Sequence, residues 1–247
     1  MDRDQSSPVE AGAAPAPEND LRPIKKIWAF FKWMLLGYAV FSALLTLSQI
    51  HLHVYILRLF EGDASQLSEA EGIFIGLHQG ILALLMLLFL LLCIVGYARF
   101  FQRSMHNARQ IEPGTNTVAP VGMWLWFAVP IANLWFPFQG VRKVWEILRS
   151  NAGEPTSHPP TFALWWIFWI LSNLVSNIAL RLPGGAWDFE LTAFNYQDLL
   201  TVNWLDIASG IMAVISSIAL YRIASTLARL QIEFEHGGSK KLEEIFE

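Results

Sequence analysis

The sequence contains few charged residues and a single cysteine. Charged residues make up 15% of the 247 positions, whereas soluble domains carry about a quarter. The lone Cys93 excludes an internal disulfide, and it lies inside an apolar stretch as a lipid-facing or packing residue. The shortage of charge therefore argues against a large soluble core and points to the long apolar stretches.

The sequence motifs of catalysis and nucleotide binding are also missing. The patterns GxSxG, HExxH and GxxxxGK[ST] and the dinucleotide fingerprint do not occur. No carboxylate pair lies within an apolar stretch. We therefore expect no enzymatic activity and no cofactor. Nucleic-acid binding is unsupported because the basic residues follow the predicted membrane surface.

Three histidines, His51, His53 and His78, fall near the predicted outer membrane surface. The first two are two residues apart, which places them on different faces of a helix. This spacing favours interfacial histidines over a metal or haem site.

Four long apolar stretches dominate the chain, at about 28–50, 73–98, 162–180 and 204–223. A helix needs about 20 residues to cross a hydrocarbon core of ~30 Å. Residues 81–95 are apolar on every face, which is typical of a membrane-spanning helix. The pattern predicts an all-α integral membrane protein with four transmembrane helices.

The basic residues predict the topology. Only Arg58 and Arg181 lie in the connections 51–72 and 181–203, and Lys32 lies just inside the first stretch. Basic residues gather on the cytoplasmic side of inner-membrane proteins. We therefore expect both termini in the cytoplasm and both connections, which are short and acidic, outside. The other fourteen of the 17 basic residues flank the stretches on the predicted cytoplasmic side: Arg3, Arg22, Lys25, Lys26, Arg99, Arg103, Arg109, Arg142, Lys143, Arg149, Arg222, Arg229, Lys240 and Lys241.

A further apolar segment at 121–140 is broken by Pro130 and Pro137, with Asn133 between them. If this segment crossed the membrane, the basic residues after it would lie outside. We therefore expect a re-entrant or interfacial segment. It either lines a substrate or ion path as a broken helix, or lies at the interface with a belt of tryptophans.

We expect a cytoplasmic tail at each end of the chain. Residues 1–22 are rich in Pro, Ala, Ser and acids, which predicts a disordered cytoplasmic tail. The membrane domain is expected over 23–235, with a helix through 222–235 that ends at Gly237–Gly238, and residues 236–247 form a second cytoplasmic tail. A short similarity between 107–112 and 227–233 raises the hypothesis of an internal repeat.

Two polar groups lie on predicted helices. Asn173 and Asn177, with Ser172 and Ser176, form i, i+4 pairs that either bridge helices or line a pore. Close packing against them is expected from Ser209, Gly210, Ser216 and Ser217 of the last stretch. The second group, Arg99, Arg103 and Arg109, attracts anionic headgroups or forms a specific phosphate or substrate site.

The segment from Asn107 to Trp145 resembles the signature of a bacterial membrane family, domain of unknown function 4328. The resemblance rests on Asn107-Ala108-Arg109, Pro120, Trp124 or Trp126, Val129-Pro130-Ile131-Ala132-Asn133-Leu134-Trp135, Pro137-Phe138-Gln139 and Trp145. Phe136 and Phe138 depart from the family pattern, which has a basic residue and Tyr there in many members. The resemblance implies a multi-span membrane protein and no particular activity. The candidate residues are Asn107, Arg109, Pro130, Asn133, Trp135, Pro137, Gln139 and Trp145.

The sequence therefore predicts a protein of the bacterial inner membrane that is a non-enzymatic module. Its expected partners are the lipid bilayer and another membrane protein or further copies of the chain. The alternative is a small transporter or channel subunit, with 121–140 and the Asn173/Asn177 face lining the path.

Overall fold

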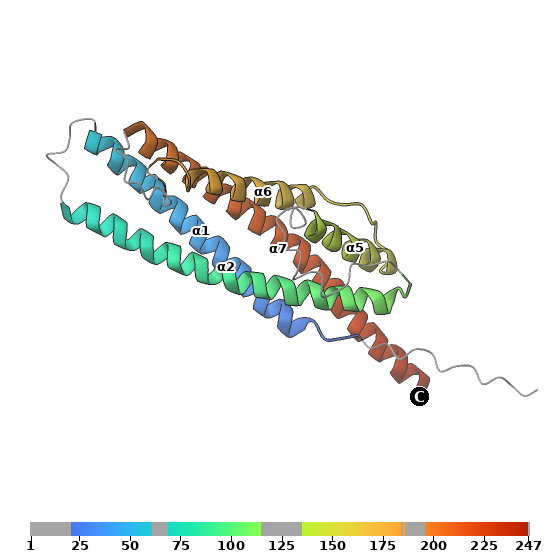
Figure 1. Cartoon of the computed structure of the whole chain (residues 1–247). Coiled ribbons are helices and arrows are strands. Elements are labelled where there is room, and N and C mark those ends of the chain that lie inside the picture. Colours follow the sequence, from blue (N-terminus) through green and yellow to red (C-terminus); the bar gives the residue numbers. More distant parts are fainter. Residues whose placement is uncertain (1–20, 61–68, 115–134, 184, 186–195, 247) are drawn as a thin grey trace, which may run out of the picture.

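The computed structural model describes residues 21–60, 69–114, 135–183, 185 and 196–246, with side chains through Gly237. All regular structure in these residues is helical (Figure 1). The all-α prediction is confirmed. The helices are α1 (Lys25–Phe60), α2 (Glu69–Ile111), α5 (Phe136–Asn151), α6 (Thr161–Ala179) and α7 (Tyr196–Phe246).

Four of these helices, α1, α2, α6 and α7, are long and apolar enough to cross a membrane. α1, α2 and α7 each contain a predicted span, and α6 contains the span 162–180 except for Leu180. Their outward faces carry large apolar side chains, such as Leu84 and Leu77 on α2, which are 69% and 64% exposed. Such continuous apolar surface suits contact with lipid and not with water. The chain is a multi-pass membrane protein.

The four long helices lie side by side in an elongated bundle (Figure 1). The most extensive contacts join α6 to α7, α1 to α2, and α1 to α7. An aromatic cluster lies in the core, where Phe31 of α1 packs on Phe100 and Tyr97 of α2 at ring distances of 5.5 and 6.1 Å. Gly96 permits this approach, because a Cβ there would lie 3.1 Å from the Phe31 backbone.

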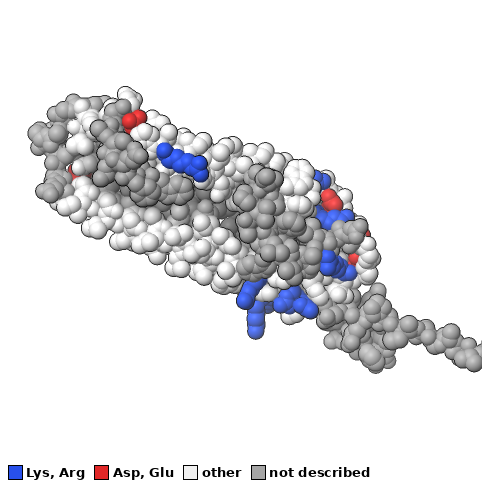
Figure 2. Space-filling view, viewed as in Figure 1, with Lys and Arg blue, Asp and Glu red and all other residues white. Residues whose placement is uncertain are grey.

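One end of the bundle holds α5, the start of α1, the end of α2 and the C-terminal half of α7 (Figure 1). We call it the α5 end. Lys and Arg side chains gather toward this end in Figure 2. α2 ends and α6 begins at this same end of the bundle. The described helices therefore alternate in direction, as four spans require.

Helix α5 is amphipathic and packs on α2 and α7. Pro137 is tolerated in its first turn because an N–H there has no partner within the helix. The predicted segment 121–140 thus ends inside α5, whereas Pro130 and Asn133 lie outside the described residues. The inward face of α5 consists of Pro137, Gly140, Val141, Val144, Trp145, Ile147 and Leu148.

Helices α1, α2 and α7 extend well beyond the predicted spans, and one predicted helix end is wrong. α1 continues to Phe60, α2 begins at Glu69, and α7 begins at Tyr196, so parts of the predicted loops 51–72 and 181–203 are helical. α7 also runs past Gly237 to Phe246 and does not end at the glycine pair. Hydropathy identifies only the part of each helix that is apolar enough to lie in the hydrocarbon core of a membrane. A glycine costs a helix about 1 kcal/mol relative to alanine, which does not force it to end.

Candidate functional site

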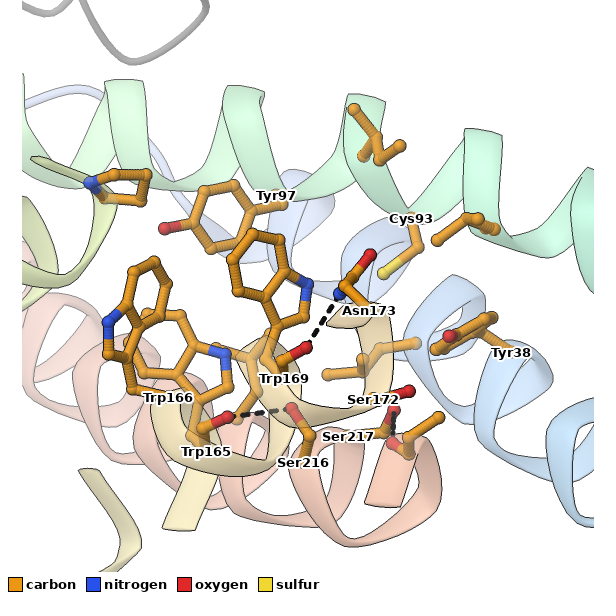
Figure 3. Close-up of a pocket in the computed structure, with 16 residues that line it drawn as sticks. Tyr38, Cys93, Tyr97, Trp165, Trp166, Trp169, Ser172, Asn173, Ser216 and Ser217 are labelled. Atoms are coloured by element: carbon orange, nitrogen blue, oxygen red, sulfur yellow. Dashed lines mark hydrogen bonds between the residues drawn. The ribbon is translucent and has the colours of Figure 1, made fainter. Parts of the chain in front are cut away.

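A cavity of about 100 Å³ lies inside the bundle, between the four long helices and the start of α5 (Figure 3). Its wall is mainly aromatic and apolar, with hydroxyl, amide and thiol groups from α1, α2, α6 and α7. The labelled wall residues in Figure 3 are Tyr38, Cys93, Tyr97, Trp165, Trp166, Trp169, Ser172, Asn173, Ser216 and Ser217. Pro137 of α5 also lines it.

Serines in and beside the cavity join α6 to α7. Ser216 Oγ donates to the Trp165 carbonyl oxygen at 2.9 Å. Ser172 Oγ donates to the Ser209 carbonyl oxygen at 3.0 Å, and Ser209 Oγ donates back to that of Ser172 at 3.2 Å. Ser172 therefore has the bridging role that the sequence allowed.

The two asparagines of α6 bond to their own helix. Asn173 Nδ2 donates to the Trp169 carbonyl oxygen at 2.7 Å, and Asn177 Nδ2 donates to that of Asn173 at 2.8 Å. Both side chains are exposed, and only Asn173 lines the cavity. The rotation of α6 thus turns its serine, and neither asparagine, toward α7.

A buried polar junction ties three segments together at the α5 end. Asn107 of α2 is 1% exposed. Its Oδ1 accepts from the Arg22 N–H at 3.0 Å, and its Nδ2 donates to the Arg22 carbonyl oxygen at 3.0 Å and to Gln231 Oε1 at 3.1 Å. Gln231 Nε2 of α7 donates in turn to Ser104 Oγ at 2.9 Å. Arg109 is half-buried on α2, two residues beyond Asn107 and on another face of the helix.

The start of α1 is held to α7 by a further contact. The Ile24 N–H donates to Glu235 Oε1 at 2.9 Å. Ile24 itself is fully buried. The chain entering α1 is therefore fixed against both α2 and α7. The two similar segments, 107–112 and 227–233, lie on the two helices that meet here, α2 and α7. The similarity did not predict the hydrogen bond between Asn107 and Gln231.

The candidate residues of α5 separate into exposed and buried positions. Trp135 and Gln139 are exposed, and the Gln139 N–H donates to the Trp135 carbonyl oxygen at 3.2 Å. Trp145 is buried, and its Nε1 donates to the Ser157 carbonyl oxygen at 3.3 Å. The Arg149 guanidinium lies 4.9 Å from the Trp145 ring centroid. Trp145 thus anchors α5 and the segment that follows it.

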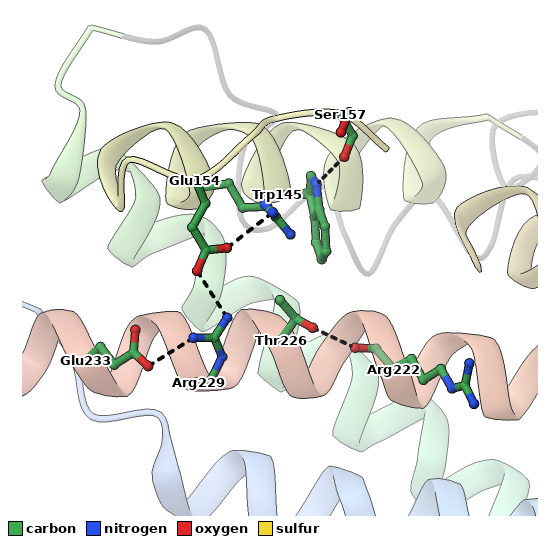
Figure 4. A network of polar contacts seen from close by, with 8 residues as sticks. Trp145, Glu154, Ser157, Arg222, Thr226, Arg229 and Glu233 are labelled. Carbon is green, nitrogen blue, oxygen red and sulfur yellow. Dashed lines mark hydrogen bonds and ion pairs between the residues drawn. The ribbon is translucent and has the colours of Figure 1, made fainter. Parts of the chain in front are cut away.

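Ion pairs extend this anchor to α7 (Figure 4). Glu154 contacts Arg149 at 3.3 Å and Arg229 at 3.2 Å, and Arg229 also contacts Glu233 at 3.2 Å. The hydrogen bond that Arg229 donates to Glu154 is the largest cause that raises the pKa of Arg229. Exposed pairs of this kind contribute only about 0–1 kcal/mol each, so they align α5 with α7 more than they stabilise the fold.

His158 lies beside this anchor, against two charged groups of α5. Arg142 Nε donates to His158 Nε2 at 3.2 Å, and Glu146 Oε1 lies 3.2 Å from the same nitrogen. Burial, followed by the Arg142 charge, lowers the pKa of His158 despite the opposing effect of Glu146. The neutral ring, with Nε2 as acceptor, is the form that fits the Arg142 contact.

Histidines at the opposite end of the bundle bridge helices. His53 Nδ1 lies 2.9 Å from Asn203 Oδ1, and His78 Nε2 lies 2.6 Å from Ser48 Oγ. No group of three or more His, Cys, Asp or Glu able to hold a metal ion occurs among the residues the structure describes. Asn203 is buried and also bonds Gln49. The sequence analysis missed Asn203, because nothing in its local pattern distinguishes it from an exposed polar residue.

A second hollow, of about 280 Å³, lies at the α5 end between the chain entering α1 and helix α2. We call it the basic recess. Arg99 and Arg103 were singled out from the sequence, but their companions were not. The spacing of 99, 102, 103 and 106 places these four residues on one helix face. The recess is lined by Arg22, Ile27, Arg99, Gln102, Arg103 and His106.

Residues 65–229 match the family model described as "Domain of unknown function (DUF4328)". The chain belongs to this family. The resemblance seen in the sequence is thereby confirmed, and the DUF4328 match extends it to all of α2, α5 and α6. Asn107, Trp145 and the cavity serines lie within the matched range, whereas Gln231 lies just beyond it. No curated protein and no solved structure matches the chain.

Proposed function

We propose that this protein is a non-enzymatic module of a bacterial inner membrane, which packs with lipids and with a membrane-protein partner or further copies of itself. One observation carries the proposal. The spanning helices expose apolar side chains, while hydroxyl groups such as those of Ser172 and Ser216 bond between α6 and α7. Polar groups used in this way join helices together.

The proposed orientation places the α5 end, with both termini, in the cytoplasm. Basic residues concentrate at this end, whereas Arg58 and Arg181 belong to the opposite end. The positive-inside rule supports the assignment. In this orientation α5 lies at the cytoplasmic surface of the membrane, with Arg142 exposed and Lys143 half-buried on its polar face.

A transporter or channel subunit is the second candidate, and one observation favours it. Pro137, from the end of the broken segment, and Asn173, from the predicted polar face, line the same cavity. A wet path through the bundle needs polar groups of this kind at membrane depth. The cavity is small and mainly apolar, which supports the packing module over the path.

A flux measurement separates the two candidates. The full-length protein is reconstituted into sealed vesicles, and the efflux of potassium ions and of glycerol is compared with that from protein-free vesicles. The module predicts equal efflux from both. Faster efflux from the protein-containing vesicles overturns the proposal.

Two matched variants locate a path if one exists. Asn173→Leu changes the cavity wall, whereas Asn177→Leu changes a similarly bonded, exposed asparagine outside the wall. A conducting cavity predicts that only Asn173→Leu alters efflux. The packing module predicts that neither variant differs from protein-free vesicles and that both remain folded.

A further inference from the structure

We infer that the basic recess is a binding site for an anionic phosphate group, of the kind carried by phospholipid headgroups. Arg22, Arg99 and Arg103 line a single hollow together with Gln102 and His106. Guanidinium groups donate in a planar fork that matches phosphate oxygens. No aspartate or glutamate is among the lining residues.

The charges of the recess differ from those of α5 and from Arg229 of α7. Arg142, Lys143, Arg149 and Arg229 each lie within 4.0 Å of a glutamate. No ion pair among the residues that the structure describes uses Arg22, Arg99 or Arg103. Three guanidinium groups near one another repel, and a bound anion relieves that repulsion. The recess therefore gathers three guanidinium groups whose charge an external anion can balance.

The recess is held open in one shape by the polar junction. Asn107 fixes the Arg22 backbone through two hydrogen bonds, and Glu235 fixes the Ile24 N–H. The chain entering α1 forms the side of the recess that faces α2. Since hydrogen bonds already fix this chain to α2 and α7, it does not need to order on binding. A site whose parts are already in place loses less entropy when its ligand arrives.

The depth of the recess fits a lipid headgroup. Arg99 directly follows the second apolar stretch, and Arg103 lies one turn further toward the α5 end. Below the recess, Phe30 lies three residues after Ile27 and Val95 lies four residues before Arg99. Phe30 and Val95 are 39% and 37% exposed. A headgroup phosphate in the recess places its acyl chains along this apolar surface. Basic pockets at the membrane surface are known recognition sites for such headgroups.

The inference deepens the proposed function, because it names a lipid chemistry for a module that packs with lipids. Its test uses purified full-length protein and does not depend on orientation or flux. Native mass spectrometry in detergent measures the fraction of protein that retains one dioleoyl phosphatidylglycerol, with dioleoyl phosphatidylcholine as the zwitterionic comparison. Retention of phosphatidylglycerol well above phosphatidylcholine is expected.

The decisive variant is Arg99→Gln/Arg103→Gln, matched by Arg142→Gln/Lys143→Gln, which removes the same charge from α5. We expect the first pair to weaken phosphatidylglycerol binding about tenfold or more and the second to leave it nearly unchanged. Equal loss in both pairs means a diffuse attraction and overturns the inference, as does equal retention of both lipids by the unaltered protein. Arg22→Gln, which keeps α2 intact, replaces the double variant if that variant does not fold, with the same expectation of weakened binding.

A competition experiment distinguishes a lipid headgroup from a water-soluble organophosphate as the source of the phosphate. Glycerol 3-phosphate is added to the lipid-bound protein. Failure to displace phosphatidylglycerol identifies a lipid site that needs the acyl chains, as Phe30 and Val95 lead us to expect. Displacement that also occurs in the Arg142→Gln/Lys143→Gln protein identifies the same site as one for water-soluble organophosphates.

Discussion

Asn107 and Gln231 lie 124 residues apart and share a buried hydrogen bond of 3.1 Å between α2 and α7. Each is 1% exposed. Each also bonds another group, Arg22 for Asn107 and Ser104 for Gln231. Buried amides that satisfy one another specify one register of the two helices, since a shifted register leaves them without partners.

Replacing Asn107 by Leu is expected to destabilise the bundle by about 1–3 kcal/mol, because the Arg22 groups and Gln231 lose their partner inside the protein. The free energy of unfolding in mixed detergent micelles measures the effect. Asn177→Leu is the control, because this exposed side chain bonds only its own helix; it should cost no more than about 0.6 kcal/mol.

A double-mutant cycle examines the pair itself. Once Asn107 is Leu, the change Gln231→Leu should cost less than it does in the unaltered protein. Strict additivity of the two losses would show that the bond between the amides contributes nothing of its own.

Gly210 marks a close approach of α7 to α1. A Cβ at this position would collide with Thr46 Oγ1, whereas one at Gly76 on α2 would meet nothing within 4 Å. Gly210→Ala should therefore cost about 1–3 kcal/mol through overpacking, while Gly76→Ala should be neutral or stabilising by up to about 1 kcal/mol. Unfolding free energies of the two variants give the comparison.

Thr46→Ala provides the matching rescue. It removes the hydroxyl that the new methyl group meets, so part of the loss caused by Gly210→Ala should be recovered in the double variant. If the loss is unchanged by Thr46→Ala, the contact between α1 and α7 is not its cause.

His158 should make the attachment of the α5–α6 connection depend on pH. Burial and Arg142 lower its pKa below that of the unfolded chain, so protonation favours the unfolded state. The contribution of His158 is thus complete above the ordinary histidine pKa of about 6.5 and is lost as the pH falls below it. Thermal unfolding at about pH 7.5 and about pH 5.5 measures the difference.

The variant His158→Gln isolates this effect from those of other titrating groups. The unfolding temperature of the variant should fall less on acidification than that of the unaltered protein. A larger drop in the variant would mean that Glu146, and not Arg142, controls the charge of His158.

The sequence predicted the spans because hydropathy over 19–26 residues is a property of each segment alone. The positions of the basic residues also predicted which ends of the spans share a side of the membrane, and that assignment stays a prediction. What the sequence did not reveal depends on helix rotation and on contacts between distant segments. Ser172 and Asn173 are neighbours in sequence, yet only Ser172 faces α7. The same holds for Arg22, whose place beside Arg99 follows from the bond to Asn107.

The central claim is that four spans carry the chain, with α5 and the end of α7 on one side of the membrane. Single cysteines at Ser150, His236 and Gln197, all exposed, test it in a Cys93→Ser background with a membrane-impermeant maleimide. We expect Ser150→Cys and His236→Cys to react only from the cytoplasmic side and Gln197→Cys only from the outside. Labelling of Ser150→Cys and His236→Cys from opposite sides would contradict the account.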